Sequence, residues 1–244
     1  MTKIEWTGRT WNPITGCTKI AQGCKNCYAE KMSKRLRGRY GYPADDPFRV
    51  TFHRDKITQP LSWRKPSMIF VCSMGDLFHE DVKLDWIDQV METIYKCPQH
   101  VFQILTKRPE RMKNILSDPQ LNLGKHLPNI WAGVSVSTQA DADRDIPFLL
   151  KTLAAVRFIS YEPALEDINF RPFIETDKIH WLICGAESGQ GARDFDESWA
   201  RSAQFQCEMF SVPFFYKQNS TEKMPILDGR VWDQLPERNH GDDR

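Results

Sequence analysis

Apolar runs separated by polar segments recur along most of the chain and indicate its secondary structure. Seven of these runs are short and rich in β-branched and aromatic residues, which is typical of buried strands. They cover residues 49–53, 68–73, 101–106, 130–136, 157–162, 179–185 and 213–217. Other segments repeat apolar residues every three or four positions, as a helix with one buried face does. These predicted helices cover 27–38, 84–97, 108–118, 142–155 and 194–210.

The predicted strands and helices alternate, and this order is typical of βαβ units in a parallel sheet. We therefore predict an α/β fold, with a single-domain partial or full (β/α) TIM-like barrel over residues 1–236. A polar C-terminal tail is expected over 237–244. A doubly wound open sheet is the second choice.

Composition and charge narrow the class of protein. The chain has 244 residues, of which 41% are hydrophobic and 27% charged, as expected of a globular protein with a full core. Its net charge of +1 gives no bulk basicity that would indicate nucleic-acid binding, although a local basic patch is compatible with it. No apolar run is long enough to span a membrane, and the start, MTKIEWTGRTW, lacks the apolar stretch of a signal peptide. We expect a cytoplasmic protein with reduced cysteines.

Three of the seven cysteines lie close together near the start of the chain. Cys17, Cys24 and Cys27 fall among loop-forming residues such as Pro13, Gly16 and Gly23, where cysteine has no packing role. The other four lie in or beside apolar patterns and are predicted to be buried; they are Cys72, Cys97, Cys184 and Cys207. In a reducing compartment a loop cluster of this kind predicts a metal or iron–sulfur site.

The spacing of the three cysteines leaves two kinds of site open. Structural zinc usually takes four protein ligands in paired motifs, and here His53 would have to complete a Cys3His site. A [4Fe–4S] cluster held by three thiolates would instead leave one iron free to bind a substrate or cofactor. Radical S-adenosylmethionine (SAM) enzymes bind SAM through such an open iron.

Polar side chains follow the predicted strands, and the carboxyl ends of barrel strands are where active sites collect. We predict Lys107 and Glu162 as catalytic residues. The candidate cofactor-binding residues are Tyr28, Ser73, Asp76, Ser135 and Glu187. Asp76, Lys107, Ser135 and Glu162 are expected around one cavity that also contains the cysteine loop.

Several of these residues also have plainer interpretations. Asp76 is placed to cap a helix beginning at Leu77, and Lys107 to lie in a solvated turn. A solvated Glu162 and a His53 that simply packs and forms hydrogen bonds are further alternatives. The glycine-rich segment 185–193 matches no nucleotide-binding motif, and we expect a flexible loop over the barrel mouth.

Long segments of the sequence carry a family resemblance. The segments that carry this resemblance are WNPITGCTKIAQGCKNCYAEK, SMIFVCSMGDLFHEDV, QILTKRPERM and GAESG. Through them the chain resembles the bacteriophage three-Cys-motif protein family, which is classed near the radical SAM superfamily. CKNCYA, SMGDLF and LTKRPERM are more distantly similar to the spore photoproduct lyase branch. The resemblance implies a radical SAM-type barrel with a [4Fe–4S] cluster on Cys17, Cys24 and Cys27, and SAM as a further cofactor.

Two features depart from the radical SAM pattern. The spacing is CX6CX2C where CX3CX2C is usual, and the position before the last cysteine is Asn26 where an aromatic residue usually contacts the SAM adenine. Tyr28 follows directly after that cysteine.

The resemblance implies a radical SAM enzyme that abstracts hydrogen, in phage DNA or nucleobase modification in the host cytoplasm. A flavodoxin- or ferredoxin-type reductant is then implied as a partner. Basic residues between Lys31 and Tyr40 favour a DNA or nucleotide substrate, although a solvated helix face would have the same composition. The alternative function is a zinc-binding module or a nucleic-acid-binding partner protein without radical chemistry.

Overall fold

A parallel sheet forms the centre of the structure, a computed structural model that describes residues 4–118 and 128–237. The sheet has seven strands in the order β1-β4-β5-β6-β7-β8-β9, and all neighbouring strands run parallel. The strands are β1 (Arg9–Trp11), β4 (Met68–Val71), β5 (Val101–Thr106), β6 (Ile130–Val136), β7 (Val156–Tyr161), β8 (Trp181–Gly185) and β9 (Phe214–Gln218). Within the described ranges β1 and β9 are edge strands that do not pair with each other, so the barrel is partial.

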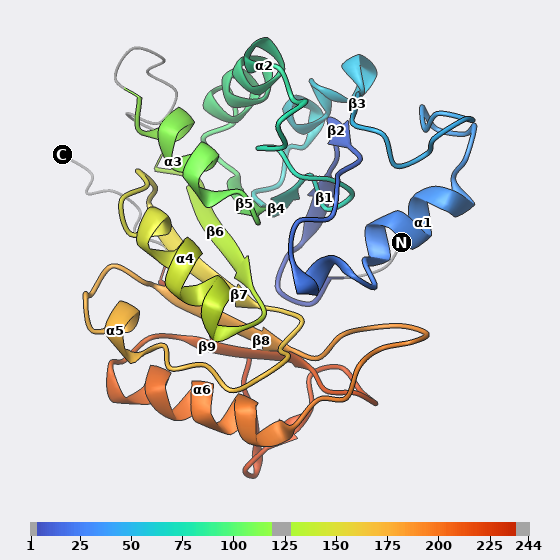
Figure 1. The fold of residues 1–244 in the computed structure, drawn as a ribbon. Helices are drawn as coiled ribbons and strands as arrows, with labels where there is room; N and C mark the ends of the chain where they lie inside the picture. Colours follow the sequence, from blue (N-terminus) through green and yellow to red (C-terminus); the bar gives the residue numbers. More distant parts are fainter. Residues whose placement is uncertain (1–3, 119–127, 238–244) are drawn as a thin grey trace, which may run out of the picture.

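Helices follow most of the strands and cover one face of the curled sheet (Figure 1). They are α1 (Tyr28–Arg35), α2 (Leu84–Tyr95), α3 (Pro109–Leu116), α4 (Gln139–Leu149), α5 (Arg171–Ile174) and α6 (Glu197–Met209). All five predicted helices are present, and α5 is a short helix that the sequence pattern does not predict. The strand order follows the chain without a reversal, which excludes the doubly wound alternative and confirms the predicted α/β partial barrel.

One predicted strand is wrong. Residues 49–53 contribute only β3 (Thr51–Phe52), which pairs antiparallel with β2 (Ile14–Thr15) outside the main sheet. The edge position belongs instead to β1, whose three residues are too few to show a strand period. Short 3-10 turns, η1 (Gln22–Cys24), η2 (Arg54–Lys56) and η3 (Gln59–Ser62), and the hairpin β10 (Ile226–Leu227) with β11 (Arg230–Val231) complete the described elements.

The two faces of the sheet have different packing. Alternate residues of each strand face the helices and form the larger core, as a strand period of two requires. The opposite, concave face carries a second cluster dominated by aromatic rings: Trp6, Phe70, Trp131, Val156, Phe158, Trp181, Ile183 and Phe215. The Phe158 ring fills the space that a Cβ at Gly133 would need. Most of these residues lie in the first half of their strands, so the aromatic layer lies mainly toward the amino ends of the strands.

Polarity along β6 changes at its carboxyl end. The inward series begins with Trp131 and Gly133 and continues, two residues at a time, to Ser135 and Ser137. The fold therefore leaves polar groups at the carboxyl end of the sheet, above an apolar floor.

No helix within residues 4–118 and 128–237 is both long enough and apolar enough to cross a membrane. The prediction of one barrel domain over 1–236 stays a prediction, and most of the expected polar tail, 238–244, lies outside the described residues.

Candidate active site

The cysteine loop, residues 16–27, connects β2 to α1 and packs against the carboxyl end of the sheet (Figure 1). Its Gly16 N–H donates to the Met74 carbonyl at 2.9 Å, just beyond β4. The two backbones approach so closely there that a Cβ at Gly75 would lie 2.8 Å from the Gly16 oxygen. Farther along, Gly23 lies against Ser137 at the end of β6. The fold thus brings the cysteines to the end of the barrel where the sequence predicts the site.

The cysteines divide into two groups, as predicted. Cys17, Cys24 and Cys27 are free thiols and partly exposed, whereas the other four are free and buried: Cys72, Cys97, Cys184 and Cys207. Burial and the nearby Asp76 carboxylate raise the pKa of Cys17 to about 12, while Arg108 opposes that rise. The Cys17 thiol is therefore neutral at pH 7 in the absence of a metal.

The donor set distinguishes the two kinds of metal site. Among the described residues, no three His, Cys, Asp or Glu side chains converge on a point where a single metal ion would bind. His53 does not join the cysteines: its Nε2 lies 2.8 Å from Thr15 Oγ1, and its ring packs so tightly that a Cβ at Gly41 would be 2.6 Å from Nδ1. This geometry does not support the Cys3His zinc site.

An iron–sulfur cluster requires a different arrangement of its ligand atoms. Each cysteine binds a separate iron of a group several atoms wide, so the sulfurs surround it and need not converge on one point. Three partly exposed thiols on one loop, above a polar strand end, fit this donor set.

Asp76 links the ends of β4 and β5. Its buried carboxylate accepts hydrogen bonds from Thr106 Oγ1 at 2.8 Å, from the Phe78 N–H at 2.9 Å and from Arg108 Nη1 at 3.3 Å. No helix begins at Leu77; the Asp76 carboxylate instead caps the turn by accepting from the Phe78 N–H. Donors of the protein itself therefore already occupy much of the hydrogen-bonding capacity of this carboxylate, which the sequence predicts to bind a cofactor.

A chain of polar contacts crosses the next strand ends. Lys107 Nζ donates to Ser135 Oγ, and Ser135 Oγ donates to the Glu162 carbonyl at 2.9 Å. Lys217, at the end of β9, forms an ion pair with the Glu162 carboxylate, and both members of this pair are largely buried. The structure thus connects the two predicted catalytic residues through a predicted cofactor-binding residue, and the Glu162 side chain is held by a lysine rather than solvated.

The four residues expected around one cavity lie at the same end of the sheet and are joined by hydrogen bonds. Asp76 accepts from the Lys107 N–H at 3.3 Å, which connects it to the chain through Ser135 and Glu162. A hollow of about 470 Å³ borders Cys17, but other residues line the rest of it: Thr18, Lys19, Glu30, Asp46, Phe48, Arg49, Val50 and Asp81. The predicted residues are therefore gathered at one end of the barrel, whereas none of the four lines this hollow.

The remaining predicted site residues are Tyr28, Ser73 and Glu187, and each of them connects two segments of the chain. Tyr28 donates its hydroxyl to the Ser73 carbonyl, which ties the start of α1 to the end of β4. Glu187, after β8, accepts from Asn26 Nδ2 at 2.8 Å and forms an ion pair with Arg193. Asn26 is the residue just before the last cysteine, and it also donates to the Gly191 carbonyl at 2.8 Å. The glycine-rich segment is thus attached to the cysteine loop.

Sequence reasoning did not select Arg108, Asn26 or Ser137 as site residues. Arg108 is buried with its guanidinium among loop and strand-end groups, and Ser137 Oγ is buried with no hydrogen-bond partner in the described part of the chain. Asn26 meets a partner 161 positions away in the chain. Arg108 and Ser137 gave a local signal, their positions just after apolar strands, and that signal is weak because many surface polar residues follow strands in the same way.

Fold and site together define a class of protein: a parallel α/β partial barrel with a three-cysteine loop over the polar carboxyl ends of its strands. The chain belongs to the family described as "Protein of unknown function (DUF5131)", whose model matches residues 1–236. No curated protein matches it. Phage origin and the three-Cys-motif family stay predictions.

Solved structures of spore photoproduct lyase resemble this chain distantly. A variant with bound AdoMet and a dinucleoside spore photoproduct has a TM-score of 0.47 and 9% identity, over 81% of this chain and 60% of that one. The lyase complexed with the dinucleoside spore photoproduct has a TM-score of 0.48 and 10% identity, over 80% and 59%. The chain therefore spans about 60% of the length of these structures. At these values the likeness assigns no activity and no residue role to this chain.

Proposed function

We propose that this protein is a radical SAM-type enzyme in which Cys17, Cys24 and Cys27 hold a [4Fe–4S] cluster. The observation that carries the proposal is the placement of three partly exposed loop thiols on the polar carboxyl end of a partial barrel. The other four cysteines are buried elsewhere, so no further thiol of the described residues is offered to the cluster. When bound, the cluster and SAM would supply the electron transfer and the radical that abstracts a hydrogen atom.

The chain's own residues would bind and orient the reactants. Lys107 and Lys217 present positive charge at the strand ends, suited to a carboxylate or a phosphate group. Ser135 holds the first of these ammonium groups in place and the Glu162 carboxylate holds the second. The aromatic layer below them excludes water from the barrel interior.

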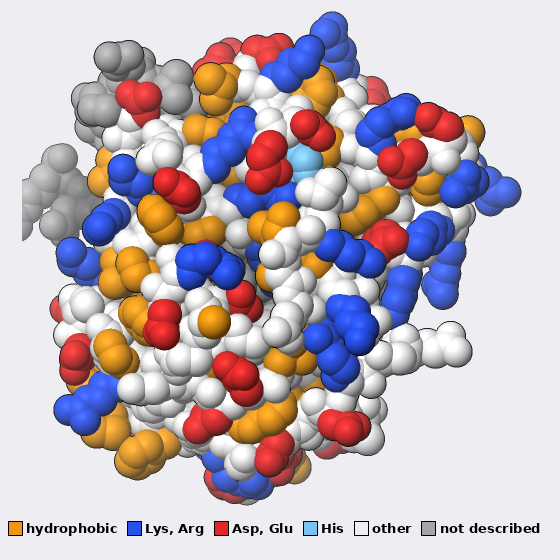
Figure 2. Space-filling model, viewed as in Figure 1, with side chains coloured by type: hydrophobic (Ala, Val, Ile, Leu, Met, Phe, Trp, Pro, Cys, Tyr) orange, Lys and Arg blue, Asp and Glu red, His pale blue; other side chains and the backbone are white. Residues whose placement is uncertain are grey.

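The proposed substrate is DNA or a nucleobase, reached across the basic side of α1. Lys and Arg side chains gather over this part of the molecule (Figure 2). All the basic residues of the segment are exposed: Lys31, Lys34, Arg35, Arg37 and Arg39. Lys31 Nζ also donates to the Gln190 carbonyl at 2.9 Å, so the basic helix adjoins the glycine-rich segment beside the cysteine loop. A flavodoxin- or ferredoxin-type reductant remains the proposed electron donor.

Metal analysis of anaerobically prepared protein tests the cluster. We expect about four iron and four sulfide per chain, with visible absorbance that disappears when Cys17, Cys24 or Cys27 is changed to alanine. Adding SAM and a reductant should then release 5′-deoxyadenosine from the wild type but from none of these three variants.

Cys97→Ala is the matched control, because Cys97 is also a free cysteine but is buried in the core. It should keep its iron. Stoichiometric zinc without iron in the wild type would contradict the proposal and favour the zinc-binding module.

A further inference from the structure

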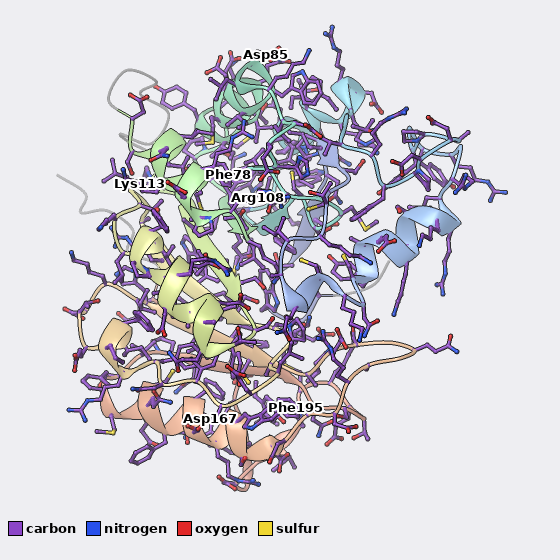
Figure 3. The ribbon with its side chains drawn as sticks, in the orientation of Figure 1. Phe78, Asp85, Arg108, Lys113, Asp167 and Phe195 are labelled. Atoms are coloured by element: carbon purple, nitrogen blue, oxygen red, sulfur yellow. The ribbon has the colours of Figure 1, made fainter. Side chains whose placement is uncertain are left out.

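Arg108 connects the cysteine loop to the strand ends with every nitrogen of its guanidinium. Nε donates to both carboxylate oxygens of Glu80 at 2.8 Å. Nη1 lies 3.4 Å from Cys17 Sγ and 3.3 Å from Asp76 Oδ2. Nη2 donates to Thr18 Oγ1 at 2.9 Å and to the Thr18 carbonyl at 3.4 Å. Its partners thus come from the loop and from the segment after β4, while Arg108 itself follows β5 (Figure 3).

The backbone places Arg108 at this junction. It lies between the end of β5 and Pro109, the first residue of α3, where proline is favoured because the first helical N–H needs no partner. The side chain is nearly buried, at 5% exposure. A buried charge of this kind is stable only with paired charges and satisfied donors, and Asp76 and Glu80 supply both.

The contacts on this guanidinium require its shape as well as its charge. Arginine presents five N–H donors in a planar fork, whereas a lysine ammonium is a single point of charge. One ammonium cannot reach Glu80, Asp76 and the loop at the same time. His79 contacts the same hydroxyl of the loop, with Nε2 at 2.9 Å from Thr18 Oγ1.

We propose that Arg108 is a positioning residue for Cys17: it fixes the first cysteine of the loop against the strand ends and donates an N–H to the sulfur that binds the cluster. The second part of this inference rests on the proposed function, whereas the fixing of the loop does not. A hydrogen bond and a positive charge at a ligating thiolate stabilise the more negative, reduced form of a cluster. Arg108 therefore raises the reduction potential of the bound cluster.

Three variants distinguish the positioning of the loop by Arg108 from the effect of its positive charge. Arg108→Gln removes the charge and the fork, and Arg108→Lys keeps the charge alone. Thr18→Val removes only the loop-side hydroxyl partner of Arg108 and His79, and serves if Arg108→Gln does not fold. Arg157→Gln is the control: Arg157 lies near the start of β7 and its Nε donates to the Thr152 carbonyl at 2.8 Å, away from the loop.

Hydrogen exchange of the metal-free, full-length protein is the first measurement. We expect the amides of residues 16–27 to exchange at least tenfold faster in Arg108→Gln and Arg108→Lys, and faster in Thr18→Val, with no change in Arg157→Gln. Unchanged exchange in both Arg108 variants would overturn the positioning role.

The reduction potential of the reconstituted cluster is the second measurement. It should shift to a more negative value in Arg108→Gln and return part of the way in Arg108→Lys, while Arg157→Gln matches the wild type. Equal potentials in all four proteins would overturn the effect on the cluster. If the wild type binds no iron, the proposed function fails, but the exchange experiment still decides whether Arg108 fixes the loop.

Discussion

Gly23 shows how a single residue adapts the cysteine loop to the barrel. It lies in η1, one position before Cys24, and a Cβ there would collide with Ser137 Oγ and lie 3.3 Å from Pro163 Cδ. Only glycine lets this turn approach the ends of β6 and β7 so closely. The close approach also explains why Ser137 Oγ is buried without a partner among the described residues: glycine carries no side chain that would bond to it.

We expect Gly23→Ala to push η1 away from the sheet and to displace Cys24. The variant should lose about 1–3 kcal/mol of stability through overpacking and take up less iron. Thermal unfolding and iron content measure the two effects.

The double variant Gly23→Ala/Ser137→Ala is the matched rescue. Without Ser137 Oγ the closest atoms to the new methyl group lie at 3.3 and 3.4 Å, which is tight but tolerable. Ser137→Ala alone should cost little, since its hydroxyl has no partner within the described ranges. A deficit of iron that persists in the double variant would argue against steric displacement of η1.

The segment between β8 and α6 contains the Glu187 carboxylate, which is held by Asn26 of the cysteine loop and by Arg193. Burial would raise the pKa of Glu187, but hydrogen bonds from Arg193 and Asn26 outweigh it and lower the pKa from 4.5 to about 2. Because the folded-state pKa is the lower one, this carboxylate stabilises the fold above pH 4.5, and the stabilisation disappears as the pH falls toward 2.

We expect the attachment of residues 186–193 to the cysteine loop to weaken from about pH 4.5 downward. The shift corresponds to roughly 3 kcal/mol of stability. Unfolding temperatures measured from pH 7 to pH 3 should fall less steeply for Glu187→Gln than for the wild type. Glu197→Gln, which removes an exposed ion-pair partner of Arg201, is the control and should keep the wild-type slope. Identical slopes for all three proteins would mean that Glu187 does not hold this connection.

At the scale of the whole molecule, charge is balanced overall but uneven locally. The net charge is only +1, so any affinity for DNA must come from a patch and not from bulk attraction. The basic segment on and after α1 forms such a patch (Figure 2). Parts of it also stabilise the fold: Arg37 Nη1 donates to the Ala44 carbonyl at 2.7 Å, and Lys34 pairs with Glu30.

If this patch contacts phosphates, DNA affinity should fall steeply with salt, because each neutralised phosphate releases counterions. Changing Lys34, Arg35, Arg37 and Arg39 to alanine should reduce the slope of log affinity against log salt by about 0.9 for each phosphate that is no longer neutralised. Fluorescence anisotropy with labelled DNA over a salt series measures that slope, and cluster content should not change.

A second quadruple variant controls for the removal of positive charge itself. It changes exposed lysines elsewhere on the surface to alanine: Lys65, Lys96, Lys151 and Lys178. Equal slopes in the two variants, or no DNA binding at low salt, would count against the patch and favour a peptide or metabolite substrate.

The sequence by itself determined the elements that carry a long periodic pattern. Five helices and six of the main-sheet strands could be predicted from it, because the spacing of apolar residues directly reflects which face of an element is buried. The same reasoning separated three loop cysteines from four core cysteines. It failed at β1, which is three residues long, and at residues 49–53, whose apolar run ends in the packed His53 rather than entering the main sheet.

Only the tertiary structure decided which side chains meet. Asn26 and Glu187 are 161 positions apart, and Arg108 lies 91 positions from Cys17. A buried polar group must find a partner, but any chain segment that the topology brings near can supply it. The sequence therefore placed polar residues at the ends of strands, whereas the curvature and order of the sheet determined that Arg108 would contact the first cysteine and Asn26 the glycine-rich segment.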